Sequence, residues 1–171
     1  MVARRLLPRF DAGARLVELA SLADPSLVPV AVGEAMDLQP DGRPVSSEGV
    51  ARIIGHDRLL LVLDNCEHLV GSAAQMADAI VRLAPNAVVL ATSRETLRIN
   101  GEYVYRVPPL EVPDRDSDPP DEILSNRAVQ MFLRLVETPH MDGLRHGQNL
   151  RSIASICRRL DGLPLAIEFA A

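Results

Sequence analysis

The amino-acid sequence predicts an α/β protein, in which a parallel sheet packed with helices is followed by a small helical region. Two observations predict the sheet: the uninterrupted apolar runs Leu59–Leu63 and Ala87–Ala91, which are separated by enough residues for one helix. Strands covered by helices on both faces have such runs without alternation. The third observation predicts the helical region, because beyond Pro108–Pro120 the apolar residues recur at helical spacing.

The elements before the first apolar run are predicted from residues that stop a helix and from residues that cap one. Residues 3–9 fit a helix end stopped by its own proline, and residues 14–20 fit a short strand. Asp24-Pro25 predicts a helix start, because proline suits the first helical position. Ser46 can cap a helix that runs to about residue 56.

A helix is expected between the two apolar runs, and a further strand after the second one. The helix extends from about Cys66 to Leu83. The further strand is Tyr103–Val107, where β-branched and aromatic residues alternate with other residues. Strands that alternate with helices in this way predict a parallel sheet with right-handed crossovers.

Three helices are expected in the C-terminal region. Ser125 can cap the first, and residues 141–147 are expected to form a loop. The apolar residues of the second recur at helical spacing, and Gly162 is its expected left-handed stop. The last helix is expected over Ala166–Ala171.

Composition excludes several functional classes. All 18 basic residues are arginine, so the chain has no lysine for a Schiff base or for a GxxxxGK[ST] phosphate loop. A net charge of −5 and 3% aromatic residues weigh against direct nucleic-acid binding. No apolar stretch approaches the roughly 20 residues of a membrane span. The two cysteines form no CxxC motif, so a reduced, cytoplasmic chain is expected.

Polar residues follow both apolar runs, at the end of a parallel sheet where ligands bind. Asp64 ends the run in LLLVLDNCEHL; a strand that delivers one acid in this way can hold Mg²⁺ beside nucleotide phosphates. Alternatively, Asp64 or Asn65 caps the following helix. Arg94, in ATSRETL, can bind phosphate oxygens in a bidentate manner or be an exposed loop arginine.

Two further motifs have plain local explanations. In LDGLPLAIEFAA, which covers Leu160–Ala171, glycine and proline are ordinary helix punctuation. Asp64, Cys66 and His68 alternate as metal ligands sometimes do, but a helix that begins there would direct them apart.

In this order, LDNCEHL, TSRETL with the following GEYVYRVPPL, and CRRLDGLPLAIE resemble the signal-transduction ATPases with numerous domains, the STAND class that includes NB-ARC domains. The resemblance is closest to the ATPase modules of bacterial LuxR-type and cyclase-linked transcriptional regulators, and it extends over essentially all 171 residues. It implies a P-loop NTPase core of the ASCE type, with LDNCEHL as the Walker B strand, TSRETL as the sensor-1 strand and GLPL as the motif of a helical subdomain.

The resemblance also implies roles for single residues and a cofactor, Mg-ATP or Mg-ADP. Asp64 would hold the magnesium ion, Arg94 would sense the γ-phosphate, and Pro164 would pack near the adenine. Asn65 departs from the two-acid Walker B of many relatives. Glu67 could replace the missing catalytic base, or be an acid that the helix dipole favours.

The resemblance leaves two parts of the family pattern unmatched. Family members place a strand and a GxGGxGKT-type loop before the region that matches Met1–Phe10, and a winged-helix domain after the GLPL helix. The chain is therefore expected to be an internal piece of a larger regulator. Its expected parts are an incomplete P-loop NTPase core over residues 1–112, a linker over 113–122 and a helical subdomain over 123–171.

Three expectations follow for the isolated chain. It should neither bind ATP tightly nor hydrolyse it, so it should not be an enzyme by itself. Its sheet should have open apolar edges, which recruit other chains and favour self-association. Two alternatives are a working ATPase whose phosphate loop comes from upstream or from another polypeptide, and an interaction module that docks on full-length relatives.

Overall fold

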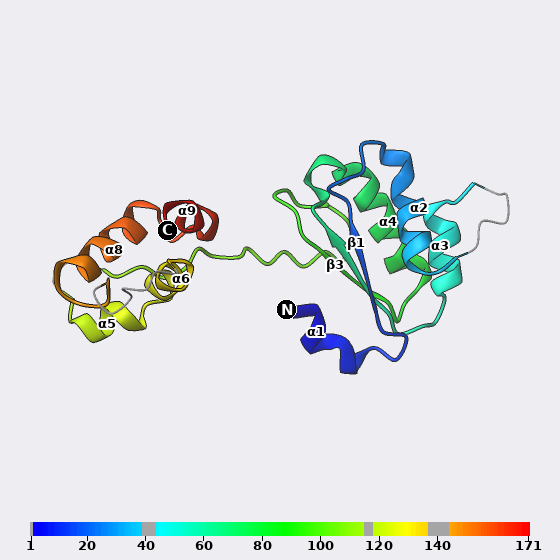
Figure 1. Cartoon of the computed structure of the whole chain (residues 1–171). Helices are drawn as coiled ribbons and strands as arrows, with labels where there is room; N and C mark the ends of the chain where they lie inside the picture. Colours follow the sequence, from blue (N-terminus) through cyan, green and yellow to red (C-terminus); the bar gives the residue numbers. More distant parts are fainter. Residues whose placement is uncertain (1, 39–43, 115–117, 137–143) are drawn as a thin grey trace. The chain divides into compact units, whose positions relative to one another are not determined.

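The computed structural model describes residues 2–38, 44–114, 118–136 and 144–171 (Figure 1). The chain divides into two compact units, Met1–Val104 and Tyr105–Ala171. The first unit holds the strands, and the second is helical. Of the loop expected over residues 141–147, residues 141–143 lie outside the described residues, and a helix begins at Gly147.

The first unit contains a three-stranded parallel sheet in the order β1-β2-β3. Its strands are β1 (Ala14–Glu18), β2 (Leu60–Asp64) and β3 (Val88–Ala91). The register aligns Ala14 with Leu60 and Leu60 with Val88, so the strands end at one edge of the sheet. The predicted parallel α/β fold is confirmed, and both uninterrupted apolar runs form strands.

Helices connect the strands of this unit close to the expected positions. They are α1 (Val2–Leu6), η1 (Leu7–Arg9), η2 (Pro25–Leu27), α2 (Val28–Ala35), α3 (Ser47–Ile54), η3 (Cys66–His68) and α4 (Val70–Leu83). The predicted cap of α3 is confirmed, since Ser46 Oγ accepts a hydrogen bond from the Gly49 N–H at 3.1 Å.

Helices α2, α3 and α4 gather on one side of the sheet (Figure 1). Strand residues that point to this side, such as Val17, Leu61 and Leu63, belong to the same buried cluster as the helices. On the other side, Leu16 is 59% exposed and Val88 is 48% exposed. The sheet therefore has an apolar composition on both faces, but the three helices cover only one of them.

The strand expected at Tyr103–Val107 is wrong, because this segment forms no ladder with the sheet. Tyr103, Tyr105 and Val107 are 89%, 72% and 82% exposed. The composition suits a strand, but a strand also needs a hydrogen-bonded neighbour. Among the described residues, β3 pairs with β2 alone, and nothing lies in register beside Tyr103–Val107.

Within the described residues, the second unit packs these helices around its own core: α5 (Pro120–Ser125), α6 (Arg127–Leu135), α8 (Gly147–Arg159) and α9 (Pro164–Ala170). Phe132, Leu150 and Ile167 bring α6, α8 and α9 together. The left-handed stop after α8 is confirmed, since Gly162 has a φ of 66°. The last helix begins at Pro164, two residues before the expected Ala166, because proline fits its first turn.

Two local expectations in the second unit need correction. Ser125 ends α5 and does not cap α6; the cap is Asn126, whose Oδ1 accepts from the Ala128 N–H at 3.1 Å. The amide oxygen of Asn126 suits this position as well as a serine hydroxyl would. In addition, α5 begins at Pro120, inside the stretch 113–122 that was expected to be a linker.

The chain that enters this unit is anchored by a close contact with Gly162. The Leu110 N–H donates to the Gly162 carbonyl oxygen at 2.9 Å. A Cβ at Gly162 would collide with the carbonyl oxygen of Leu110, so only glycine fits this approach. Val112 packs against the helical core, and Pro113 is buried.

Candidate functional site

The predicted magnesium ligand, Asp64, lies at the carboxyl end of the central strand and is partly buried. The Thr92 hydroxyl donates to Asp64 Oδ1 at 2.5 Å and accepts from the Asn65 N–H at 2.9 Å. Because Thr92 directly follows β3, these two bonds join the ends of two neighbouring strands. The Thr92 backbone strengthens the junction: its N–H donates to the Leu63 carbonyl and its carbonyl accepts from the Cys66 N–H, both at 2.9 Å.

The chain turns sharply after Asp64. Asn65 adopts the left-handed conformation with φ of 62°, which asparagine tolerates better than most residues. Neither η3 nor α4 has a side-chain N-cap, so the capping roles considered for Asp64 and Asn65 are not observed. The Asn65 amide instead lies 3.5 Å from His68 Nδ1, and His68 Nε2 lies 2.9 Å from the Leu22 carbonyl oxygen.

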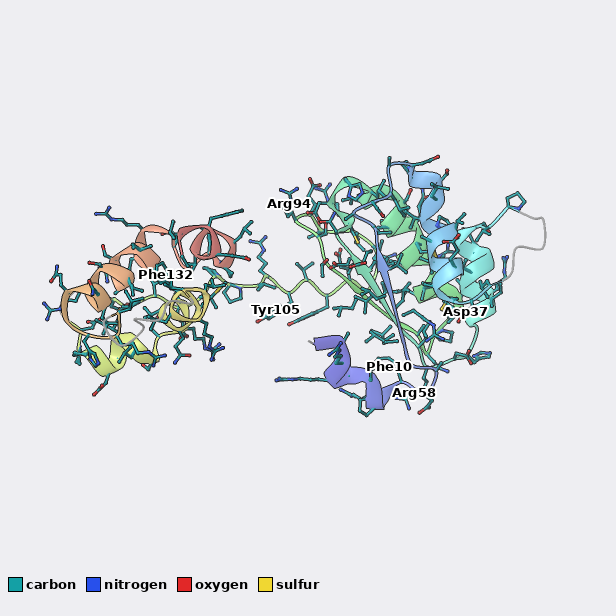
Figure 2. The ribbon with its side chains drawn as sticks, viewed as in Figure 1. Phe10, Asp37, Arg58, Arg94, Tyr105 and Phe132 are labelled. Atoms are coloured by element: carbon teal, nitrogen blue, oxygen red, sulfur yellow. The ribbon has the colours of Figure 1, made fainter. Side chains whose placement is uncertain are left out.

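The two other site residues of this unit, Glu67 and Arg94, form an ion pair. Arg94 Nε lies 3.1 Å from Glu67 Oε1. The Arg94 side chain is 85% exposed and the Glu67 side chain 20% exposed, so the pair is open to solvent on the arginine side. Figure 2 shows Arg94 beyond the sheet, at the end of the α/β unit. The structure therefore brings Asp64, Glu67 and Arg94 to the carboxyl ends of neighbouring strands.

Sequence reasoning missed two residues at this edge. Thr92 was seen only as part of a polar strand end, although its hydroxyl is the direct partner of Asp64. Glu18 ends β1 and is in register with Asp64, so a second, exposed carboxylate stands beside the first. No clear signal in the sequence marked Glu18, because the strand was predicted over residues 14–20 and Glu18 lay inside it, whereas β1 ends at Glu18.

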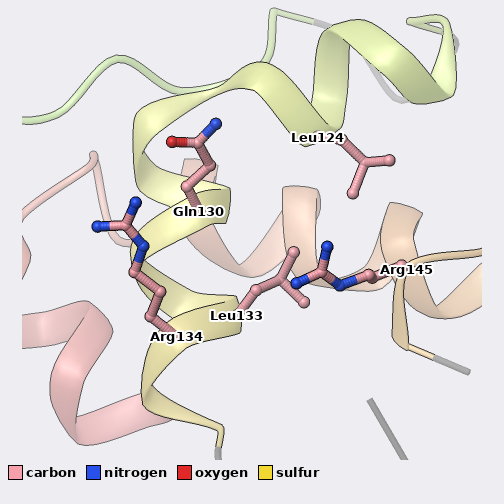
Figure 3. A pocket seen from close by; sticks show the side chains of 5 residues that line it. All are labelled: Leu124, Gln130, Leu133, Arg134 and Arg145. Carbon is pink, nitrogen blue, oxygen red and sulfur yellow. The ribbon is translucent and has the colours of Figure 1, made fainter. Parts of the chain in front are cut away.

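Pro164 belongs to the second unit, where it is the exposed first residue of α9. Its role as an adenine contact stays a prediction. The same unit contains a cavity of about 260 Å³ lined by residues of α5, of α6 and of the turn before α8 (Figure 3): Leu124, Gln130, Leu133, Arg134 and Arg145. The two arginines give this cavity a positive charge, but none of the predicted site residues lines it.

The cysteines and histidines do not form a metal centre in the part of the chain that the structure describes: no three His, Cys, Asp or Glu side chains converge there. Cys66 is buried, and burial, together with the nearby charges of Asp64 and Glu67, raises the pKa of its thiol to about 11. The thiol therefore stays protonated near neutral pH and is a poor soft-metal ligand. A magnesium ion needs only one or two carboxylates beside its phosphate ligands.

No helix among the described residues is long and apolar enough to cross a membrane.

Comparisons with known proteins connect the chain to bacterial regulators. It is 35% identical over 159 residues to a Mycobacterium tuberculosis protein named "Putative HTH-type transcriptional regulator", and a Mycobacterium bovis protein of the same class matches equally. It is 33% identical over 154 residues to an uncharacterized Mycobacterium tuberculosis protein. These matches cover 93% and 90% of the chain, but only 17% and 36% of the two Mycobacterium tuberculosis relatives. No family model matches, and no solved structure matches.

Proposed function

We propose that this chain is the magnesium and sensor part of a STAND-type nucleotide-binding module in a transcriptional regulator. The observation that carries the proposal is the junction of Asp64, Thr92 and Arg94 at the carboxyl ends of β2 and β3, where ligands of parallel sheets bind. The names of the regulator relatives support the regulatory part of the proposal.

In the proposed module, Asp64 would hold Mg²⁺, which neutralises charge on the nucleotide phosphates when it is bound. The Thr92 hydroxyl fixes the carboxylate by donating to one of its oxygens, and leaves the other available. Arg94 would bind the terminal phosphate through its exposed guanidinium. A phosphate would then compete with Glu67 for Arg94, and the released Glu67 carboxylate could accept a proton from water.

The proposed module would need a phosphate cradle from outside these 171 residues, because the chain contains no lysine and no GxxxxGK[ST] loop. About four charge-assisted bonds of roughly 1.5–3 kcal/mol each would be missing, which amounts to about 6–12 kcal/mol. That loss corresponds to at least about four decades of affinity. The chain alone would therefore bind Mg-ATP weakly and would not be an enzyme.

In the full regulator, the module would act as a nucleotide-dependent switch in the cytoplasm. Pro164 and the GLPL helix would contact the adenine from the helical unit. Direct contact with DNA would belong to other parts of the protein, because this chain carries a net charge of −5.

The test compares the chain with a longer protein that adds the preceding residues of its gene, by titration calorimetry with Mg-ATP and with ATP plus EDTA. We expect binding only by the longer protein, with a requirement for Mg²⁺. Asp64→Asn should weaken Mg-ATP binding by at least tenfold, and Arg94→Ala should reduce the preference for ATP over ADP. Asp78→Asn is the matched control, since Asp78 lies on α4 and pairs with Arg82 at 2.8 Å.

Two results would contradict the proposal. One is equal Mg-ATP affinity in the Asp64→Asn and Asp78→Asn proteins, because Asp64 would then have no part in binding. The other is micromolar binding of Mg-ATP by the isolated chain, which would mean that these residues hold the triphosphate without the missing cradle.

A further inference from the structure

The short helix η3 contacts the segment that follows β3 in two places. The Cys66 N–H donates to the Thr92 carbonyl at 2.9 Å, and the Glu67 carboxylate pairs with Arg94 at 3.1 Å. The ion pair is a weak anchor, because the Arg94 side chain is 85% exposed and exposed pairs contribute little to stability. In the proposed function a phosphate would also take Arg94 away from Glu67. The backbone bond of Cys66 would then remain on this side of η3.

The last residue of η3, His68, contacts the segment that follows β1, on the opposite side of β2. His68 Nε2 lies 2.9 Å from the Leu22 carbonyl oxygen, across 46 residues of sequence. This segment is itself fixed on the sheet. The Leu19 N–H donates to the Asp64 carbonyl, and the Leu22 N–H donates to the Leu19 carbonyl, both at 2.9 Å. Leu22 is therefore a well-placed partner, because two hydrogen bonds connect it to the end of β2.

The partners of the His68 ring determine where its proton lies. The Leu22 carbonyl oxygen can only accept, so Nε2 carries the hydrogen of that bond. The Asn65 amide nitrogen, which can only donate, lies 3.5 Å from Nδ1, so Nδ1 is the acceptor. The ring is therefore a neutral imidazole with its hydrogen on Nε2, and it connects Leu22 to the residue that follows Asp64.

We propose that His68 is a positioning residue of the strand-end site, because it holds η3 and the turn at Asn65 against the segment after β1. Asp64 then keeps its place when a phosphate takes Arg94. The turn needs this support, since the φ of 62° at Asn65 is a conformation that persists only where the surrounding contacts enforce it. The inference rests on the proposed function, because Asp64 is the proposed magnesium ligand.

The His68 side chain is exposed, so it does not act by filling the core. Its contribution is the polar connection between two segments that are distant in the sequence. A variant that keeps the donor to Leu22 should therefore behave like the natural chain, and one that only keeps a similar size should not.

The first measurement is the alkylation of Cys66 in the whole chain, without nucleotide. Cys66 begins η3 and is buried, so its alkylation requires η3 to open. His68→Ala should speed this alkylation by roughly two- to tenfold, the range expected for the loss of one hydrogen bond. Cys157 lies in the helical unit and is the internal control, whose alkylation should not change.

Two amide variants separate the hydrogen bond from the size of the side chain. His68→Gln places an amide nitrogen near the position of Nε2 and can still donate to the Leu22 carbonyl. His68→Asn places its amide nitrogen near the position of Nδ1, which is too far from that carbonyl. We expect His68→Gln to keep the slow alkylation of Cys66 and His68→Asn to match His68→Ala.

The second measurement locates the proton of the ring, by imidazole nitrogen NMR of the whole chain in mildly alkaline buffer. We expect a neutral His68 ring with its hydrogen on Nε2. This hydrogen should exchange slowly enough with water to be observed, because it is held in the bond to Leu22. The spectrum of His68→Gln, which lacks the ring, assigns the signal.

The third measurement connects His68 to the proposed magnesium ligand. It uses the longer protein that includes the preceding residues of the gene, and titration calorimetry with Mg-ATP. His68→Ala should weaken Mg-ATP binding by at least threefold, and His68→Gln should restore most of the loss. Asp78→Asn, on the surface of α4, is again the control.

The outcomes distinguish a failure of the inference from a failure of the proposed function. If Asp64→Asn weakens Mg-ATP binding and His68→Ala does not, the proposed function stands and the inference is wrong. If Asp64→Asn has no effect, the proposed function fails, and the alkylation of Cys66 alone decides whether His68 holds η3.

Three further results would overturn the inference. Unchanged alkylation of Cys66 in His68→Ala would mean that the contact with Leu22 does not hold η3. Equal acceleration by His68→Gln and His68→Ala would mean that the donor at Nε2 is not what matters. A His68 ring with its hydrogen on Nδ1 would exclude the hydrogen bond itself.

Discussion

The two units of this chain leave apolar surface exposed in different ways. In the α/β unit the uncovered residues, such as Leu16 and Val88, lie on a sheet whose strand β3 pairs, among the described residues, with β2 alone. In the helical unit two exposed apolar residues of α9, Leu165 and Phe169, lie on a helix whose backbone bonds are internal. An open sheet edge therefore specifies the geometry of its partner, a strand in register, whereas an exposed helix face specifies only apolar character.

The largest expected effect tests whether the two units unfold independently of each other. Leu61 in β2 is fully buried and Leu150 in α8 is 1% exposed, and each belongs to the core of its own unit. Leu61→Ala and Leu150→Ala should each lower the free energy of unfolding of one unit by about 2–5 kcal/mol, because a cavity is left behind.

Because each unit contains one cysteine, thiol alkylation can measure the stability of each unit by itself. Cys66 lies in the α/β unit and Cys157 in the helical unit, and burial raises the pKa of both thiols to about 11. Alkylation near neutral pH therefore requires local opening. Leu61→Ala should speed alkylation of Cys66 only, and Leu150→Ala that of Cys157 only. Equal acceleration of both thiols by either variant would show one cooperative unit.

The same thiols give a pH dependence with a definite sign. In each unit the folded state keeps the thiol protonated up to about pH 11, while the unfolded thiol ionises near its ordinary pKa of 9.0. Burial of the neutral thiols thus contributes stability below pH 9 that is lost as pH rises toward 11. Cys66→Ala and Cys157→Ala should each flatten this loss in their own unit.

A smaller effect is expected at Gly162, where the helical unit depends on a local close approach. Gly162→Ala places a Cβ against the Leu110 carbonyl and requires alanine at a φ of 66°. We expect a loss of about 2–4 kcal/mol from the combined backbone strain and overpacking. Gly147→Ala is the matched control: its φ is 57°, and no described atom lies within 4 Å of the added Cβ.

The difference between these two variants isolates the collision from the conformational strain. It is measured by urea unfolding followed by the alkylation of Cys157. Equal losses in both variants would mean that the contact between Leu110 and Gly162 does not anchor the entering chain. The α/β unit, reported by Cys66, should be unaffected by either change.

How well each unit could be predicted depends on how far apart in the sequence its interacting residues lie. In the helical unit the signals are local, since Gly162 and Pro164 mark boundaries within a few residues, and the one capping error moved the cap by a single residue to Asn126. In the α/β unit the buried runs identified β2 and β3. The same reasoning failed for Tyr103–Val107, because alternation reports what a segment favours and cannot report whether a neighbour is present.

The candidate site shows the same limit. Asp64 and Arg94 could be singled out because each follows an apolar strand, and the order of parallel strands puts them at one edge. The hydrogen bond from Thr92 to Asp64 spans 28 residues of sequence, and the bond between Arg94 and Glu67 spans 27. Such partners depend on the register between two strands, which a single sequence does not reveal.

The smallest expected effect concerns the coupling energy of the Glu67–Arg94 ion pair at the strand ends. It is compared with the coupling energy of an ion pair on the surface of a helix. The Arg94 side chain is 85% exposed, so the pair should contribute only about 0–1 kcal/mol to stability, and less at high salt. Asp78 and Arg82, at 2.8 Å on α4, form the reference pair. Double-mutant cycles with Glu67→Gln and Arg94→Gln, and with Asp78→Asn and Arg82→Gln, measure both couplings by urea unfolding.

We expect the two couplings to agree within about 0.5 kcal/mol, as exposed pairs do. Agreement would mean that the Glu67–Arg94 pair contributes no more to the free energy of unfolding than an ordinary exposed ion pair. Arg94 could then leave Glu67 and bind an incoming anion with little loss of stability. A coupling well above that of the helix pair would instead make Arg94 a structural clamp on η3. In that case the site would have to be rebuilt before Arg94 could contact a phosphate, and the proposed sensor role would lose its physical basis.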